Sequence, residues 1–327
     1  MRVMNASEVE AALETEALVE QLRQMFRAGV DVPTRHHHTV PVPGGEDATL
    51  LLMPAWQVGR YMGVKLVTVF PGNAQKDLPS VMGAYALLSA RTGEPLAMID
   101  GRMLTLRRTA CASALAAKYL ARSDASRLLM VGTGALAPHL VLAHAGVRPI
   151  KEVLIWGRDL RKAQRLAHNL TSRRMRVSAT ADLEGAVRGA DIISCATLSK
   201  EPLVRGDWLR EGQHVDLVGG FTPEMREADD AAIDRARVFV DTYAGALKEA
   251  GDIVQPIKNG VLTRESIAGD LAELTQGRVA GRRFHNQITL FKSVGTAIED
   301  LAAAILVFET MLGADAEAAP HSEVLRG

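Results

Sequence analysis

Cysteine, charge of one sign and long apolar runs are all scarce in this sequence. Its two cysteines, Cys111 and Cys195, form neither a disulfide framework nor a metal-binding spacing, which favours a reducing compartment such as the cytoplasm. Acidic and basic residues balance at 38 each, so no basic excess indicates a nucleic-acid partner. An apolar run at residues 301–307 is too short to span a bilayer. We therefore expect a globular protein with neither nucleic acid nor membrane as a partner.

The first third of the chain combines helices with short strands. The chain has 327 residues, enough for two domains. Ser7 and Glu10 have the spacing of a capping box, so the N-terminus is expected to start a helix and not a signal peptide. A hairpin turn is expected at residues 91–95. This part is predicted to be a small antiparallel α+β unit, with strands at residues 32–40, 49–53 and 63–69.

A pattern of strand, glycine turn and helix begins near residue 128. Residues 128–131 are apolar and end at Gly132, as in a buried parallel strand. Gly132 permits a tight turn, Gly134 lets a pyrophosphate approach the backbone, and Ala137 keeps the next helix close to the strand. The N-terminus of that helix offers free N–H groups to phosphates, and Pro138 is tolerated in its first turn. The pattern predicts a dinucleotide-binding site.

Further strands follow at the spacing of βαβ units, and a last helix is expected at residues 293–310. Residues 122–126 are expected to form a linker. The predicted fold class is α/β, with a Rossmann-type doubly wound parallel sheet and a smaller α+β substrate and dimerisation domain. The predicted limits are residues 1–120 with 293–327 for the smaller domain and 121–292 for the Rossmann domain. The further strands are residues 152–156, 191–196 and 214–218.

Arg158 bears on which dinucleotide is bound. In this fold an acidic residue about 20 positions after the glycine turn selects NAD by binding the ribose hydroxyl. This sequence has Arg158 at that distance, and a guanidinium suits the 2′-phosphate of NADP. Asp159 follows at once and would still serve NAD, and the cations here are also compatible with a solvated helix start. We therefore expect NADP(H) to be preferred and NAD(H) to be possible.

The motifs together resemble the ornithine cyclodeaminase/mu-crystallin family, over most of the chain. The resemblance implies binding of NAD(H) or NADP(H), a homodimer built through the N-terminal domain, and an active site between the two domains. Its members include cyclodeaminases, alanine dehydrogenases and reductases of cyclic ketimines. Leu136 is a small departure, since many members have glutamine there. The specific motifs are residues 63–67, 104–114, 132–137, 191–197, 219–229 and 291–300.

The resemblance also assigns site residues. It implies that Arg35, Lys65 and Arg108 hold the substrate carboxylate, with Lys65 and Arg108 also in catalytic roles. Val294 is expected on the substrate side. Predicted cofactor contacts are Thr109, Gly132, Gly134, Ala135, Leu136, Arg158, Thr197 and Ser293.

The residue types agree with a carboxylate clamp. A helix is expected at residues 105–120, which would put Arg108 near a helix N-terminus, where dipole and guanidinium both favour an anion. Lys65 interrupts an apolar strand, where an unpaired ammonium would be costly, although an edge-strand lysine is the ordinary alternative. Arg35 precedes a triplet of histidines, of which only His36 and His38 would share a face. No nearby ligand completes a metal site, so no metal is expected.

Phe221 is the most informative departure from the cyclodeaminases. These enzymes have an aspartate at this position, which handles the proton transfers of deamination and ring closure. Phenylalanine carries no proton to exchange, and Glu224 is the nearest candidate for a displaced replacement. We therefore expect an NAD(P)-dependent oxidoreductase that reduces cyclic ketimine carboxylates such as pyrroline-2-carboxylate and piperideine-2-carboxylate to proline and pipecolate. The alternatives are ornithine cyclodeaminase, a lyase, and a non-catalytic mu-crystallin-like binding protein.

Overall fold

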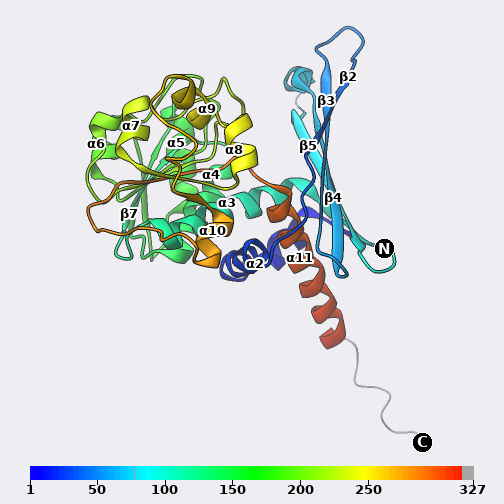
Figure 1. Cartoon of the computed structure of the whole chain (residues 1–327). Helices are drawn as coiled ribbons and strands as arrows, with labels where there is room; N and C mark the ends of the chain where they lie inside the picture. The colour runs from blue at the N-terminus through cyan, green and yellow to red at the C-terminus, as the bar shows by residue number, and fades with distance from the viewer. Residues whose placement is uncertain (77, 319–327) are drawn as a thin grey trace, which may run out of the picture. The chain divides into compact units, whose positions relative to one another are not determined.

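The computed structural model describes residues 1–76 and 78–318. They form two compact units, each with its own sheet (Figure 1). Unit 1 comprises residues 1–21, residues 29–108 and the segment that begins at Ala297, and unit 2 comprises residues 22–28 and 109–296. The division falls inside one helix, between Arg108 and Thr109. The functional division predicted at residues 120 and 293 stays a proposal.

Unit 1 is built on a six-stranded sheet in the order β1-β6-β5-β4-β3-β2. All its pairings are antiparallel except that of β1 with β6, which is parallel and was not expected from the sequence. The expected hairpin joins β5 to β6, and the Ser89 hydroxyl accepts the N–H groups of Arg91 and Thr92 in its turn. The elements are β1 (Arg2–Met4), α1 (Ala6–Ala12), α2 (Thr15–Ala28), β2 (His36–Val40), β3 (Ala48–Trp56), β4 (Tyr61–Val69), a 3₁₀ helix (Pro71–Lys76), β5 (Val81–Ser89), β6 (Pro95–Asp100), α3 (Gly101–Leu120) and α11 (Ala297–Ala318). Both α2 and α3 continue into unit 2.

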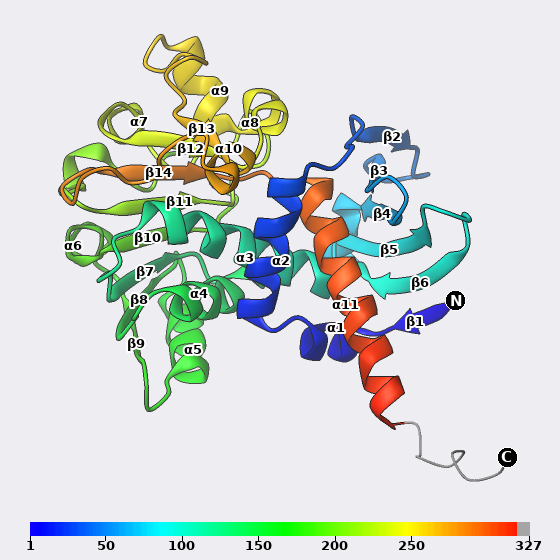
Figure 2. The ribbon, with the colours of Figure 1, turned by 60° about the horizontal axis from the view of Figure 1, so that its bottom comes forward.

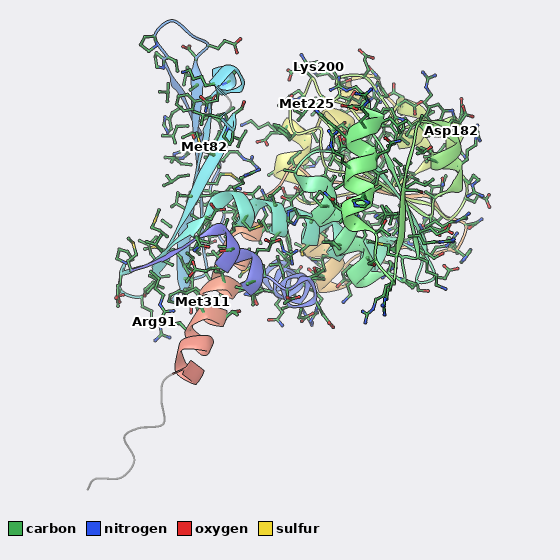
Figure 3. The ribbon with its side chains drawn as sticks, turned by 180° about the vertical axis from the view of Figure 1, so that it is seen from behind. Met82, Arg91, Asp182, Lys200, Met225 and Met311 are labelled. Carbon is green, nitrogen blue, oxygen red and sulfur yellow. The ribbon has the colours of Figure 1, made fainter. Side chains whose placement is uncertain are left out.

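The two faces of this sheet differ. The long helix α11 packs on β3, β4 and β5 and covers the face on which Lys65 lies. On the opposite face Trp56 pairs with Met62, and Leu66 pairs with both Leu52 and Ala84. Apolar side chains on this face stay partly exposed, among them Trp56 at 37%, Leu66 at 36% and Met82 at 41%; Met82 is marked on β5 in Figure 3. An apolar sheet face of this kind is typical of an interaction surface.

Three helix starts differ from the prediction. The capping box of α1 is formed by Asn5 and Glu8 and not by Ser7 and Glu10, because the Asn5 side chain accepts the first free N–H groups. Helix α3 starts at Gly101, four residues earlier than expected, since the Asp100 carboxylate accepts the N–H of Met103. Helix α11 starts at Ala297 and not at residue 293.

Unit 2 is an eight-stranded, wholly parallel sheet in the order β13-β12-β14-β11-β10-β7-β8-β9 (Figure 2). The first strand, β7, lies between β8 and β10, so the strand order reverses beside it. This is the Rossmann-type arrangement, and the predicted fold class is confirmed. The strands are β7 (Arg127–Val131), β8 (Glu152–Trp156), β9 (Arg176–Thr180), β10 (Ile192–Cys195), β11 (His214–Leu217), β12 (Arg237–Val240), β13 (Gly269–Asp270) and β14 (Thr289–Lys292).

Helices connect these strands, as parallel pairing requires. Residues 251–254 form the first turn of α9. No helix in residues 1–76 and 78–318 is long and apolar enough to cross a membrane. The connecting helices are α4 (Leu136–Val147), α5 (Leu160–Leu170), α6 (Leu183–Gly189), a 3₁₀ turn (Gly206–Trp208), α7 (Asp230–Arg235), α8 (Tyr243–Glu249), α9 (Gly251–Lys258) and α10 (Leu271–Gln276).

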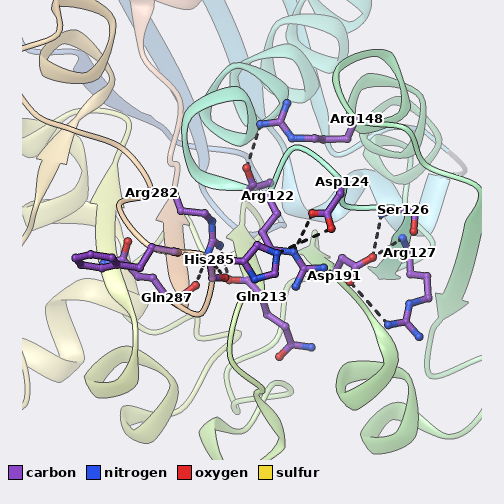
Figure 4. A network of polar contacts seen from close by, with 12 residues as sticks. Arg122, Asp124, Ser126, Arg127, Arg148, Asp191, Gln213, Arg282, His285 and Gln287 are labelled. Carbon is purple, nitrogen blue, oxygen red and sulfur yellow. Dashed lines mark hydrogen bonds and ion pairs between the residues drawn. The ribbon is translucent and has the colours of Figure 1, made fainter.

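The segment predicted to be a linker, residues 122–126, is instead tied into unit 2 (Figure 4). Arg122 donates to Asp191, at the start of β10, over 2.8 Å. The other carboxylate oxygen of Asp191 accepts the backbone N–H groups of Ser126 and Arg127. These charge-assisted bonds fix the entry into β7, so the sheet begins at a rigid point.

Candidate functional site

The glycine turn after β7 has the geometry expected of a phosphate-binding turn. Gly132 has a φ of +124°, and a Cβ there would lie 2.5 Å from the carbonyl oxygen of Ala196, so only glycine fits. A Cβ on Gly134 would meet nothing within 4 Å, which leaves the backbone open to close approach by a ligand. Helix α4 starts at Leu136, with Pro138 in its first turn as expected. The turn thus keeps its backbone accessible.

A pocket of about 580 Å³ opens at this turn, at the carboxyl ends of the strands next to the reversal of strand order. It brings together four of the predicted cofactor residues: Gly132, Gly134, Arg158 and Thr197. Ala135 and Leu136 continue the turn into α4 without lining the pocket. The full lining is Gly132, Thr133, Gly134, Trp156, Gly157, Arg158, Asp159, Lys162, Ala196, Thr197, Leu198, Ser199 and Leu203.

Three predicted contacts lie away from the pocket lining. Thr109 is buried within α3, and its side chain is 8% exposed. The hydroxyl of Ser293 and the N–H of Val294 both donate to one oxygen of Asp241, at the end of β12. These bonds, with a third from the N–H of Gly295, hold residues 293–295 outside any helix after β14, and α11 starts later than predicted. The predicted substrate and cofactor roles of Thr109, Ser293 and Val294 therefore stay predictions.

Cations line the pocket beyond β8. The side chain of Arg158 is exposed there, with no hydrogen bond or ion pair to any described residue. Lys162 also lines the pocket. Asp159 is occupied differently, because its carboxylate caps α5 by accepting the N–H groups of Arg161 and Lys162. The charges that remain available to a ligand at this edge are positive.

A buried carboxylate that the sequence did not single out shapes the opposite wall. Glu227 accepts the backbone N–H and the hydroxyl of Thr197 at 2.7 and 2.8 Å, and its second oxygen accepts the N–H of Gly219 at 2.8 Å. A Cβ on Gly219 would lie 2.0 Å from the carbonyl oxygen of Thr197. Glu227 therefore links the loop after β10 to the loop after β11 by hydrogen bonds, and it sets the position of Thr197 in the pocket.

Two further buried charges support Glu227. Asp252 accepts the N–H groups of Glu227 and Ala228, and Lys292 pairs with Asp252 at 3.0 Å. Burial raises the pKa of Glu227, and Asp252 raises it further while Lys292 opposes both. Glu227 and Lys292 stand in motifs that carried the family resemblance without an assigned role. In the sequence, the sign of this cluster is Lys292, a lysine at the end of an apolar strand, where a buried cation needs a carboxylate partner.

The turn after Gly219 and Gly220 has no carboxylate at position 221, where cyclodeaminases have an aspartate. Phe221 occupies it and is 47% exposed. Glu224 is fully exposed, and a hydrogen bond from its own backbone N–H, helped by Thr222, lowers the pKa of its carboxyl. An exposed carboxylate stabilised as the anion is a poor proton donor, so Glu224 does not replace the missing aspartate.

In unit 1 the predicted clamp residues converge on two buried carboxylates of α11. Lys65 lies on β4, 3% exposed, and its ammonium contacts the two oxygens of Asp300 at 2.9 and 2.8 Å. Arg108 pairs through Nε with Asp300 at 2.9 Å and through Nη1 with Glu299. Both carboxylates are fully buried. In the sequence analysis these two carboxylates stand only at the end of the motif at residues 291–300, without an assigned role.

The charges of this cluster perturb one another. Burial, followed by the adjacent Arg108, lowers the pKa of Lys65 to about 8. For Asp300, burial would raise the pKa, but Arg108, Lys65 and Arg35 together lower it. The structure thus brings Lys65 and Arg108 together, and the charge of Arg35 acts on the same carboxylate.

One physical argument for the clamp was wrong. Arg108 is the eighth residue of α3, two full turns after its start and not near the N-terminus. The helix dipole acts within the first turn and so does not support an anion here. The positive potential comes from the clustered cations instead.

The histidine triplet lies on β2, exposed along its length. The rings of His36 and His38 meet edge to face with centroids 6.2 Å apart, so they share one side as expected. Within residues 1–76 and 78–318 no group of three or more His, Cys, Asp or Glu side chains is arranged to hold a metal ion.

Comparison with known proteins decides the family. The model of the ornithine cyclodeaminase/mu-crystallin family matches residues 1–315. The chain belongs to this family. The predicted family is thus confirmed, and the motifs that carried the resemblance include the glycine turn, Lys65, Arg108 and Glu227.

Named relatives within the family are similar over nearly the whole chain. The Delta(1)-pyrroline-2-carboxylate reductase of Colwellia psychrerythraea is 38% identical over 315 residues, which cover 95% of this chain and 99% of the relative. The structure of the Thermococcus litoralis Delta(1)-pyrroline-2-carboxylate reductase, in complex with NADH and L-proline, superposes with a TM-score of 0.89 at 32% identity, covering 96% and 98%. An archaeal alanine dehydrogenase dimer with bound NAD gives 0.88 at 30% identity, covering 96% and 97%.

Proposed function

We propose that this protein is an NAD(P)H-dependent reductase of cyclic ketimine carboxylates. It converts pyrroline-2-carboxylate or piperideine-2-carboxylate into proline or pipecolate. The observation that carries the proposal is the clamp of Arg35, Lys65 and Arg108. In the same chain, Phe221 follows Gly219 and Gly220 at the position where cyclodeaminases have a proton-transferring aspartate. Relatives named pyrroline-2-carboxylate reductase, one of them solved with NADH and L-proline, support it.

The clamp accounts for substrate binding. Lys65 and Arg108 are already held by Asp300, so little side-chain freedom is lost when a carboxylate binds. A single carboxylate fixes the adjacent C=N carbon at a set distance from these cations, which is the positioning that hydride transfer needs. Bound NAD(P)H supplies the hydride. The open backbone at Gly134 and the cations near Arg158 suit its phosphates.

The two alternatives explain less of the site. A cyclodeaminase must move protons on and off amino groups, and neither Phe221 nor the exposed Glu224 is suited to that task. A pure binding protein has no need of a cation cluster held by two buried carboxylates. Absorbance of NADPH, followed with either cyclic ketimine, tests the proposal: oxidation of the cofactor that depends on ketimine supports it, and none at any ketimine concentration contradicts it.

NADP(H) preference is a further proposal, and it rests on Arg158. We expect NADPH to bind more tightly than NADH, because a 2′-phosphate would meet an unpaired guanidinium at the pocket edge. Replacing Arg158 by alanine should weaken NADPH by roughly 1.5–3 kcal/mol and leave NADH nearly unchanged. Fluorescence titration of each cofactor measures this.

Arg161 provides the matched control for that titration. It is the next arginine along the chain, lies in the first turn of α5 and does not line the pocket. Arg161→Ala should bind both cofactors like the parent. Equal affinity of the parent for NADPH and NADH, or equal losses in the two variants, would remove the argument for NADP.

We also propose a homodimer formed through the outer apolar face of the unit 1 sheet, defined by Trp56, Met62, Leu66 and Met82. These side chains are partly exposed in the single chain, and a solved relative is described as a dimer. Sedimentation at micromolar concentration should show twice the chain mass. Leu66→Glu should yield monomers, because a charge at this face would be buried without a partner.

The control for the dimer is Leu142→Glu. Leu142 is 45% exposed on α4 of unit 2, far in sequence from the sheet, and a charge there should leave the mass unchanged. A monomeric parent protein would sink the dimer proposal.

A further inference from the structure

His37 points away from the two histidines that flank it. In the pairing of β2 with β3, His36 lies opposite Leu52 and His37 lies opposite Leu51. Successive side chains of a strand alternate between faces. His36 and His38 therefore share the outer apolar face with Leu52 and Leu66, while His37 shares the inner face with Leu51.

The inner face is the face of the clamp. Leu51 is two residues from Met53, and Met53 pairs directly with Lys65. His37 and Lys65 therefore lie on the same side of the sheet. Arg35 is two residues before His37, and its charge contributes to lowering the pKa of Asp300. Two residues along a strand span about 7 Å, so His37 stands one row of side chains away from Arg35.

Burial changes along these rows. The row of Ala55, Gly63 and Leu87 is buried beneath the helices, and so is the next row, with Met53, Lys65 and Tyr85. The row after that, with Leu51 and Val67, is only partly buried, and His37 at its end is exposed. This face of the sheet is therefore less covered on the side of Lys65 where His37 lies.

We propose that His37 donates the proton that accompanies hydride transfer. This inference rests on the proposed function. The C=N carbon takes a hydride from NAD(P)H, which leaves as NAD(P)⁺, and the nitrogen takes a proton from the imidazolium N–H of His37. One C–H and one N–H bond form, the C=N bond becomes a single bond, and water then returns a proton to His37. Histidine is the commonest side chain for such general acid catalysis.

Other groups near the clamp are less suited to this task. Lys65 is engaged by Asp300 and is needed for the carboxylate. The hydroxyl of Tyr85 is buried without a hydrogen-bond partner among the described residues, and it lies over Gly63, on the covered side of Lys65. Among the described strands β2 pairs with β3 alone, and the uncharged Leu51 lies opposite His37. The charged groups at this face are Arg35, Lys65 on β4, Arg108 on α3, and the carboxylates of Glu299 and Asp300 on α11.

The triplet supplies its own control. His37→Gln and His38→Gln change neighbouring exposed imidazoles that point to opposite faces. Rates of NADPH oxidation with pyrroline-2-carboxylate should be compared for the parent and both variants from pH 6 to 9. At a pH above the pKa of the free ketimine, the substrate nitrogen is unprotonated. There His37→Gln should lower kcat/KM by about 10²-fold or more, and His38→Gln should match the parent. At lower pH the deficit of His37→Gln should shrink, because the substrate then arrives already protonated.

Three results would overturn the inference. If His37→Gln kept the parental kcat/KM at high pH, His37 would not be the acid. If its deficit were the same at every pH, the role of His37 would be structural. If the parent reduced no cyclic ketimine at all, the proposed function would fail first, and the inference would fall with it.

Discussion

Replacing Arg108 or Lys65 by alanine is expected to lower kcat/KM for ketimine reduction by roughly 10²- to 10³-fold. Each change removes a charge-assisted contact to the substrate carboxylate and also leaves Asp300 buried with one cation fewer. Each tenfold loss in kcat/KM corresponds to about 1.4 kcal/mol, so this range is about 3–4 kcal/mol of transition-state binding. The measurement is steady-state kinetics, with NADPH binding titrated separately. Cofactor affinity should hold, because the dinucleotide pocket consists entirely of unit 2 residues.

Conservative variants separate charge from folding. Arg102 is an exposed arginine on the same helix, and Arg102→Ala should retain parental kinetics. Lys65→Arg keeps a cation that does not titrate near neutrality. Because Lys65 is protonated below its pKa of about 8, its share of carboxylate binding is present below that pH and lost as the pH rises through it. KM of the parent should therefore rise above about pH 8, and Lys65→Arg should flatten that rise. Parental kcat/KM in Lys65→Ala or Arg108→Ala would remove that residue from the clamp.

The second large effect is the absence of cyclodeaminase activity. Both reactions need a carboxylate clamp and a nicotinamide, and they differ in proton chemistry. A reductase accepts a cyclic ketimine that needs one proton and one hydride. A cyclodeaminase must oxidise ornithine, release ammonia and let the distal amine close the ring, and a positioned acid and base contributes about 10²- to 10⁴-fold to such steps. Phe221 supplies no proton, so we expect little or no ammonia from ornithine.

Glu224 is the residue that would rescue the alternative, and it gives a direct control. It is fully exposed in the same turn, and local hydrogen bonds favour its ionised form. Glu224→Gln should therefore leave ketimine reduction unchanged. A strong loss in this variant would mean that Glu224 takes part in the reaction and that Phe221 has been misinterpreted.

The parts of the fold that follow from local sequence were predictable. The strand, glycine turn and helix at Gly132 and Gly134 are contiguous, and each residue acts on its immediate neighbours. The same holds for the hairpin at residues 91–95 and for the cations after β8. Helix starts were less predictable, because Ser7 and residue 105 satisfy general preferences while Asn5 and Asp100 are the residues that cap.

The carboxylates that organise the candidate site were not predictable in the same way. Glu227 reaches Thr197 across 30 positions, and Asp300 reaches Lys65 across 235. No spacing rule joins such residues, because tertiary packing brings them together. The sequence could name the cations of the clamp through the family resemblance, but the burial beside Arg108 that lowers the pKa of Lys65 required the structure. The same holds for the direction of His37, since a strand pattern alone does not say which face meets the helices.

One paired assay tests the central claim most directly. The purified parent protein is given NADPH with pyrroline-2-carboxylate in one cuvette and ornithine with catalytic NAD in another, with cofactor oxidation followed in the first and ammonia in the second. A ketimine reductase oxidises NADPH rapidly in the first and releases almost no ammonia in the second. Rapid formation of ammonia and proline from ornithine, without ketimine reduction, would contradict the claim and establish the cyclodeaminase.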